Sequence, residues 1–408
     1  MRLLTGIAIA IVFISCSSNH KTELKEGIWR GVIGIQGQDL PFTFLVETDS
    51  AHHINVSIKN ASENILLDEV IIDSDTVSIT LHIFDAQLKA KINGDSLTGF
   101  FIKNSELNYK LPFKAAFGQD FRFTDIKQTA VPDYTGKYAV TFRNETDTTL
   151  AVGIFTQKLS VVEGTFLTTT GDYRYLEGNI LNDTLHLSTF DGNHAYLFTA
   201  IKKNDSTLVG EYWSGKSWHQ SWNGARDESA TLPDAETLTY LKEGYRSIDF
   251  NFPDVNGNKI SPTNEKYKNK VLILQIMGTW CPNCLDETKF LKEWYKQNNK
   301  RGVEILALAY EAKDDFAYAS TRVKKMKDKL GISYDIVIAG TKDKAEASKT
   351  LPMLNRVAAF PTTIFIGRDG YVKKIVTGFS GPGTGLYYEH YVQHFNETVN
   401  DLLLENID

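Results

Sequence analysis

The chain has 408 residues and a mass of 45.9 kDa, which at about 100–200 residues per domain predicts several domains. Hydrophobic residues make up 42% and aromatic residues 12% of the sequence, which excludes a disordered or low-complexity chain. The net charge of −6 argues against a nucleic-acid partner bound by phosphate neutralisation. Three cysteines, Cys16, Cys281 and Cys284, are too few for a disulfide-stapled scaffold.

Residues 1–16 have the pattern of a secretory signal peptide. Residues 3–14 form an uncharged run that is too short to span a bilayer. The Phe-Ile-Ser-Cys sequence that ends at Cys16 resembles a bacterial lipobox, although Phe13 stands where Leu, Ile or Val is usual. We therefore expect a cell-envelope lipoprotein held to the membrane through Cys16, with residues 17–26 as a tether. An ordinary signal peptide is the alternative, and the choice between periplasm-facing and outer-membrane placement stays open.

Residues 27–225 alternate between apolar and polar side chains, with short polar turns between the runs, which predicts an all-β region. Three landmarks recur at a nearly constant offset, which indicates a duplication into units at residues 27–118 and 119–225. The matched segments are Gly27-Ile-Trp29 with Gly136-Lys-Tyr138, Phe84-Asp85 with Phe190-Asp191, and Leu97-Thr-Gly-Phe-Phe101 with Leu208-Val-Gly-Glu-Tyr212. Each copy is expected to form an antiparallel barrel, with a sandwich shared between the copies as the alternative.

The pattern changes after a charged stretch, residues 226–246, which we interpret as a linker with a short helix near residues 234–242. Residues 247–408 alternate buried strands with helices, which predicts an α/β fold. The predicted strands are residues 271–277, 303–309, 334–339, 362–366 and 371–377, and the predicted helices run from the cysteine pair to about residue 299, over 314–330 and over 386–405. The last two strands form a hairpin. The basic residues of the second helix are expected to form a solvated face; they are Arg322, Lys324, Lys325, Lys327 and Lys329.

Cys281 and Cys284 lie where the first strand of this domain passes into its helix. Unpaired N–H groups and the helix dipole at that point lower the pKa of a thiol, and thiolate is the nucleophile of disulfide exchange. Cys281 is expected to be the exposed, attacking thiol, and Cys284, three residues on, can resolve the mixed disulfide. Pro282 suits a first helical turn. The pair could instead be half of a zinc site, but no further ligands stand at suitable spacing, and no metal or cofactor is expected.

Trp280-Cys-Pro-Asn-Cys284 and Phe360-Pro-Thr-Thr363 together resemble the thioredoxin superfamily, and more narrowly its TlpA/ResA group of extracytoplasmic thiol-disulfide oxidoreductases. The segment of residues 249–260 resembles the entry to that domain. The glycine-rich segment of residues 378–385 resembles Bacteroidetes members that carry an added N-terminal β-region. The resemblance covers residues 247–408 and implies a thioredoxin-like fold there.

The resemblance implies roles for several residues. Pro361, after Phe360, matches the cis-proline that faces the cysteine pair and helps to hold the substrate. Glu287 matches an acidic residue that could relay a proton to or from Cys284, although a glutamate favoured by the helix dipole is the alternative. Gln275 stands where thioredoxin has a buried aspartate, and it cannot take up a proton.

Trp280 and Asn283 complete the expected surroundings of the cysteine pair. The sequence departs from the group's pattern at Thr288, Ala359 and Gly367, none of which removes a catalytic group.

The predicted function is an envelope-anchored protein-disulfide reductase with protein disulfides as substrates and a membrane electron donor or acceptor as partner. A thiol peroxidase is disfavoured because Cys281 lacks the Pro-x-x-x-Thr-x-x-Cys setting. A ligand-binding lipoprotein with an accessory redox domain is the alternative from another class. Apocytochrome c maturation, general disulfide reduction and rescue of oxidised thiols all remain open as roles.

Overall fold

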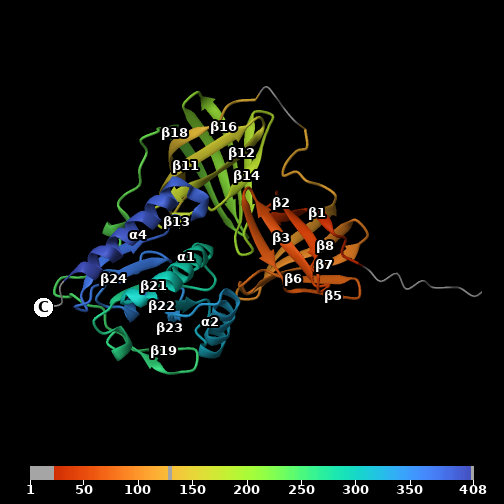
Figure 1. The fold of residues 1–408 in the computed structure, drawn as a ribbon. Coiled ribbons are helices and arrows are strands. Elements are labelled where there is room, and N and C mark those ends of the chain that lie inside the picture. The colour runs from red at the N-terminus through yellow and green to blue at the C-terminus, as the bar shows by residue number, and fades with distance from the viewer. Residues whose placement is uncertain (1–22, 127–130, 406–408) are drawn as a thin grey trace, which may run out of the picture.

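The computed structural model describes residues 23–126 and 131–405 and contains three lobes: two β-units and one α/β domain (Figure 1). The predicted signal peptide, Cys16 and most of the predicted tether lie outside the described residues. Within those residues, no helix is both long enough and apolar enough to cross a membrane.

β-unit 1 is a nine-stranded antiparallel sheet that curls around its own apolar core. Its strands are β1 (Gly27–Ile35), β2 (Gln38–Thr48), β3 (Ile54–Asn60), β4 (Glu63–Leu67), β5 (Val70–Asp73), β6 (Thr76–Thr80), β7 (Ala86–Asn93), β8 (Ser96–Lys103) and β9 (Tyr109–Phe117). Strand β9 pairs with β1, and β4 and β5 form the two edges of the sheet. Alternating side chains of β7 and β9 point inward, as the period of two predicts.

β-unit 2 closes into a barrel, because β11 pairs with β12 and so joins the two ends of its sheet. Its strands are β10 (Gly136–Arg143), β11 (Thr148–Lys158), β12 (Val161–Thr168), β13 (Gly171–Asp172), β14 (Leu176–Leu181), β15 (Thr184–Phe190), β16 (Ala195–Asn204), β17 (Thr207–Ser214) and β18 (Trp218–Arg226). Aromatic side chains fill the barrel, with Phe142, Phe166 and Tyr212 among them.

The predicted duplication agrees with the topology. In each unit the first strand pairs with the last, β1 with β9 and β10 with β18. The landmark Leu97–Phe101 lies in β8 and its counterpart Leu208–Tyr212 lies in β17, each the penultimate strand of its unit. The two units have separate sheets, so the shared sandwich is not observed.

The third lobe is an α/β domain with a five-stranded sheet in the order β23-β22-β21-β24-β25. Its strands are β21 (Val271–Met277), β22 (Val303–Glu311), β23 (Asp335–Thr341), β24 (Thr362–Ile366) and β25 (Val372–Thr377), preceded by the short pair β19 (Phe252–Pro253) and β20 (Lys259–Ile260). Its helices are α1 (Pro282–Asn298), α2 (Phe316–Leu330), α3 (Lys344–Thr350) and α4 (Leu386–Leu404). The three buried strands β21, β22 and β23 run parallel, and the hairpin adds two antiparallel strands, as predicted.

The segment between β18 and β19 holds a single 3-10 turn (Ala235–Thr237) in place of the predicted short helix. Asp234 caps that turn, but the chain beyond it pairs with another segment, because Leu241 forms a β-bridge with Leu354 and Tyr240 accepts from the backbone of Asn355.

The expectation of a solvated basic face on α2 is wrong for three of its five residues, because β-unit 1 docks there (Figure 1). Arg322 donates to the carbonyl oxygen of Ile83. Lys325 lies 2.7 Å from a carboxylate oxygen of Glu69, and Lys329 lies 3.2 Å from the other. The core of β-unit 1 is continuous with the core of the α/β domain, so the two lobes bury apolar surface against each other.

Candidate active site

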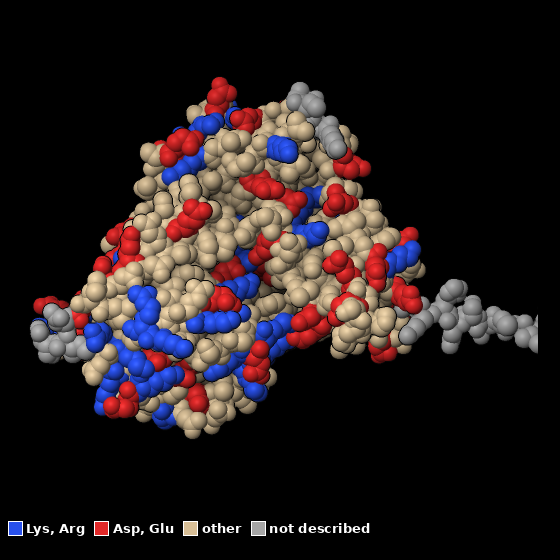
Figure 2. Space-filling view, viewed as in Figure 1, with Lys and Arg blue, Asp and Glu red and all other residues tan. Residues whose placement is uncertain are grey.

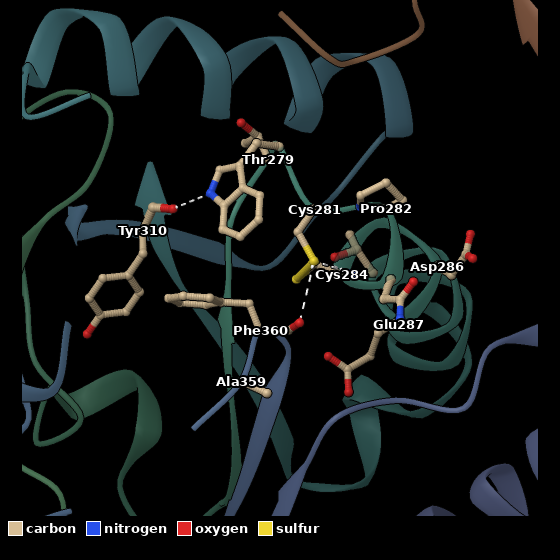
Figure 3. The surroundings of a disulfide bond; sticks show 12 residues. Thr279, Cys281, Pro282, Cys284, Asp286, Glu287, Tyr310, Ala359 and Phe360 are labelled. Carbon is tan, nitrogen blue, oxygen red and sulfur yellow. Dashed lines mark hydrogen bonds between the residues drawn. A yellow bond between two sulfur atoms is a disulfide. The ribbon is translucent and has the colours of Figure 1, made fainter. Parts of the chain in front are cut away.

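The two cysteines lie at the junction between β21 and α1, where the parallel sheet delivers the chain to a helix N-terminus (Figure 3). Cys281 is the N-cap of α1, and its Sγ accepts a hydrogen bond of 3.2 Å from the backbone N–H of Cys284. The two residues form a disulfide with a Cα–Cα distance of 5.2 Å. The helix N-terminus therefore supplies a donor to the Cys281 sulfur, and such a donor favours a thiolate when the pair is reduced.

Both cysteine residues are buried: Cys281 is 6% exposed and Cys284 is fully buried. The expectation that Cys281 is an exposed thiol is therefore wrong for this structure. Loops of β-unit 2 also contact Trp280 and Pro282, on either side of Cys281.

The loop before β24 faces the disulfide. The Phe360–Pro361 peptide bond is cis, as the resemblance implies, and the carbonyl oxygen of Phe360 lies 3.6 Å from the Cys281 Sγ (Figure 3). The Phe360 ring packs edge-on against Trp280, whose indole N–H donates to the carbonyl of Tyr310 at 2.8 Å. The Phe360 backbone carbonyl thus lies directly beside the attacking sulfur.

Glu287 projects from α1 one turn beyond Cys284 and is fully buried. Its carboxylate accepts hydrogen bonds from Thr363 (2.6 Å), Tyr391 (2.8 Å) and the side-chain amide of Gln275 (2.8 Å). Burial raises the pKa of Glu287, and these three donors oppose that rise. None of its described hydrogen bonds goes to a cysteine sulfur, so the carboxylate lies near the pair without contacting it. Gln275 serves as a donor to Glu287 from the buried strand β21.

A second buried carboxylate, which the sequence analysis did not identify, lies on the other side of the loop. Glu311, at the end of β22, accepts from the backbone N–H of Thr279 at 3.0 Å and from its hydroxyl at 2.7 Å. Burial raises the pKa of Glu311. The sequence does offer a signal for Glu311, because it is an acidic residue at the end of a long apolar strand. The end of such a parallel strand lies at the same sheet edge as the cysteine loop.

The sequence analysis also missed three residues of β-unit 2 that reach the cysteine loop. Asn193 donates to the carbonyl of Trp280, Arg174 donates to the carbonyl of Pro282, and the carbonyl of Asp172 accepts from the Asn283 amide. Nothing in a single sequence pairs residues that are about a hundred positions apart in different lobes, so no local signal could have found them.

The disulfide lies at a helix N-terminus and faces a cis-proline loop. This geometry defines a thioredoxin-like domain. Comparison with known proteins agrees. The model of the AhpC/TSA family matches residues 244–375. A thiol-disulfide oxidoreductase ResA from Geobacillus thermodenitrificans is 31% identical over 140 residues, which cover 34% of this chain and 72% of that protein. The ResA protein of Bacillus subtilis is 28% identical over 34% of this chain and 69% of its own length. The chain belongs to the ResA family and is a thiol-disulfide oxidoreductase.

Among solved structures, a thiol:disulfide interchange protein of the thioredoxin family from Chlorobium tepidum aligns with 40% of this chain and 99% of its own, with 20% identity and a TM-score of 0.30. The matched relatives align with about a third of this chain, so the activity inferred from them concerns the α/β domain, and the β-units need an account of their own.

Proposed function

We propose that the protein is a protein-disulfide reductase that works through Cys281 and Cys284 while anchored in the cell envelope. The observation that carries the proposal is the disulfide at the N-terminus of α1, facing the backbone of the Phe360–Pro361 loop. The division into a signal peptide, tether, two β-units, linker and redox domain belongs to the same proposal, as does lipidation at Cys16.

In the reduced enzyme the Cys281 thiolate attacks one sulfur of a client disulfide. A bond forms between Cys281 and that sulfur, and the client's other sulfur leaves as a thiolate that takes up a proton. Cys284, deprotonated, then attacks the Cys281 Sγ, so that the enzyme disulfide forms and the second client thiolate is released. Two electrons pass from the enzyme dithiol to the client, and a membrane electron donor restores the dithiol.

Glu287 is proposed to accept the proton of Cys284 as its thiolate forms, because it is the buried carboxylate one helical turn beyond that residue. Its raised pKa suits this role, since a carboxylate that holds a proton more tightly is a stronger base. Gln275 and Tyr391 keep the carboxylate in place. The cis peptide before Pro361 leaves the backbone of Phe360 facing the sulfur, where a client strand would lie.

The test is reduction of insulin disulfides with a chemical reductant as electron source. Cys16→Ala should retain full turnover, which makes it the matched control for loss of a cysteine. Cys281→Ser should abolish turnover, and Cys284→Ser should accumulate a mixed disulfide with the client that mass spectrometry detects. Turnover that survives Cys281→Ser would refute the proposal.

A further inference from the structure

We infer that the two β-units cap the redox loop and that Arg174 and Asn193 are positioning residues that determine which client disulfides reach Cys281. The inference rests on the proposed function and assigns the β-units a part in substrate selection. It begins from the burial of Cys281 and from the hydrogen bonds that β-unit 2 makes to the residues beside it.

β-unit 2 makes hydrogen bonds to three residues that surround Cys281. The Asn193 amide donates to the carbonyl of Trp280 at 2.8 Å. The Arg174 guanidinium donates to the carbonyl of Pro282 at 3.2 Å. The Asn283 amide in turn donates to the carbonyl of Asp172 at 3.2 Å. The attacking cysteine thus sits in a loop that another lobe holds on both sides.

Two glycines mark points where β-unit 2 and the redox domain approach each other closely. A Cβ added at Gly171 would lie 2.2 Å from the Asn283 amide nitrogen, and one added at Gly378 would lie 2.9 Å from the backbone of Thr170. Both glycines also have positive φ, which side chains rarely adopt. The cap therefore lies directly on the backbone of the redox domain.

One buried cation joins all three lobes. The Arg174 guanidinium, 3% exposed, pairs with Asp286 of α1, with Glu63 of β-unit 1 and with Asp191 of its own unit at 3.6 Å. These carboxylates keep the pKa of Arg174 well above its ordinary value despite its burial. A buried ion pair that loses one partner leaves an uncompensated charge, which is strongly destabilising. Removing Arg174 should therefore release the contact between the lobes.

The duplication supplies the cap with two equivalent loops. The loop that includes Phe84-Asp85 in β-unit 1 matches the loop that includes Phe190-Asp191 in β-unit 2. The loops touch, since a Cβ at Gly192 would lie 3.3 Å from the Leu81 side chain. Each also contacts the redox domain: Asp85 accepts from the Tyr318 hydroxyl at 3.0 Å, and Asn193, in the second loop, bonds to the cysteine loop. Figure 2 shows that the three lobes meet around a hollow where acidic and basic side chains gather.

For the attack, the Cys281 sulfur must lie on the line of the client's S–S bond. The client must therefore fit beside the Phe360 carbonyl. With the cap seated, the residues on both sides of Cys281 are hydrogen-bonded to β-unit 2. A small disulfide needs only a slight opening, whereas a folded protein needs the cap displaced. The cap therefore selects against bulky clients, and Arg174 and Asn193 set how strongly it does so.

The test uses the full chain with Cys16→Ala and Cys284→Ala, which leaves Cys281 as the one thiol. The rate of alkylation is measured with iodoacetamide and with a maleimide carried on a large polyethylene glycol. The ratio of the two rates cancels changes in thiolate fraction and reports steric access alone. The ratio is that of the maleimide rate to the iodoacetamide rate. Arg174→Ala should raise this ratio about tenfold or more, and Asn193→Ala, which loses one hydrogen bond, should raise it about threefold. The control Arg226→Ala, an exposed arginine of the same unit, should stay within about twofold.

The inference is overturned if Asn193→Ala and Arg174→Ala both keep the wild-type ratio, or if Arg226→Ala raises it equally. If Arg174→Ala does not fold, Asn193→Ala decides alone, together with hydrogen exchange. Exchange should rise in residues 278–286 of that variant while β21 and β22 stay protected, and unchanged exchange in residues 278–286 would count against the cap. Insulin turnover of the wild-type chain is measured separately, so that failure of the reductase proposal is distinguishable from failure of the cap.

Discussion

Two buried glutamates flank the cysteine loop and differ in what holds them. Glu311 accepts from the loop itself, through the backbone and side chain of Thr279. Among the residues that the structure describes, Glu287 accepts from side chains alone, those of Gln275, Thr363 and Tyr391. A carboxylate tied to backbone has a structural task, whereas one that is held by side chains next to Cys284 can change its protonation without moving the chain.

Replacing Glu287 with glutamine should stabilise the fold and slow the reaction. Burial raises the folded-state pKa of Glu287, so the ionised side chain destabilises the folded state above the ordinary pKa of 4.5. The cost is absent below that value, where both states are protonated, and grows as the pH rises to the folded-state pKa. Glu287→Gln should therefore gain about 1 kcal/mol or more in unfolding free energy at pH 8 and none near pH 4, while turnover falls about 10²-fold.

Urea denaturation across this pH range and insulin turnover provide the two readouts. Glu293→Gln, an exposed position on the same helix, serves as the control and should change neither. A stability difference that does not vary with pH would contradict the assigned burial cost, and unchanged turnover would contradict the proton role.

At the scale of elements, the helix α2 illustrates what sequence can and cannot predict. Its apolar positions, among them Ala319, Val323 and Met326, repeat at helical spacing, and the helix forms where that spacing predicts it. Its basic positions carry no such information, because a lysine that pairs with another lobe and a lysine in water look alike in the sequence. The structure separates them: Lys325 meets Glu69, whereas Lys324 pairs with Asp328 on its own helix.

Arg322→Ala should weaken the contact between β-unit 1 and α2. The Arg322 guanidinium donates to the buried Ile83 carbonyl, and the variant leaves that acceptor unpaired. We expect a loss of about 1–2 kcal/mol in the free energy of unfolding measured with urea. Lys324→Ala, in an exposed pair within the same helix, should cost less than about 0.5 kcal/mol. Equal effects of the two substitutions would contradict the assigned docking surface.

At the scale of the whole molecule, the sequence predicts the lobes but not how they meet. Strand periodicity and the repeated landmarks are local, so they identify two β-units, and the strand-to-helix junction with its cysteine pair identifies the redox domain. Arg174 lies in an ordinary polar turn, and Asn193 follows a glycine in another. Both side chains matter because they bond to residues about a hundred positions later in the chain. A single sequence does not show which distant residues are in contact. The same contacts lie on either side of Cys281, which is buried where the sequence analysis expected exposure.

The most direct test of the central claim is the reduction potential of the Cys281–Cys284 couple, measured in the Cys16→Ala chain by equilibration with defined glutathione buffers. An enzyme that reduces client disulfides needs a dithiol more reducing than those clients, so we predict a potential near or below about −220 mV. A potential near about −120 mV, that of a strong oxidant, would contradict the account and make the protein a donor of disulfides.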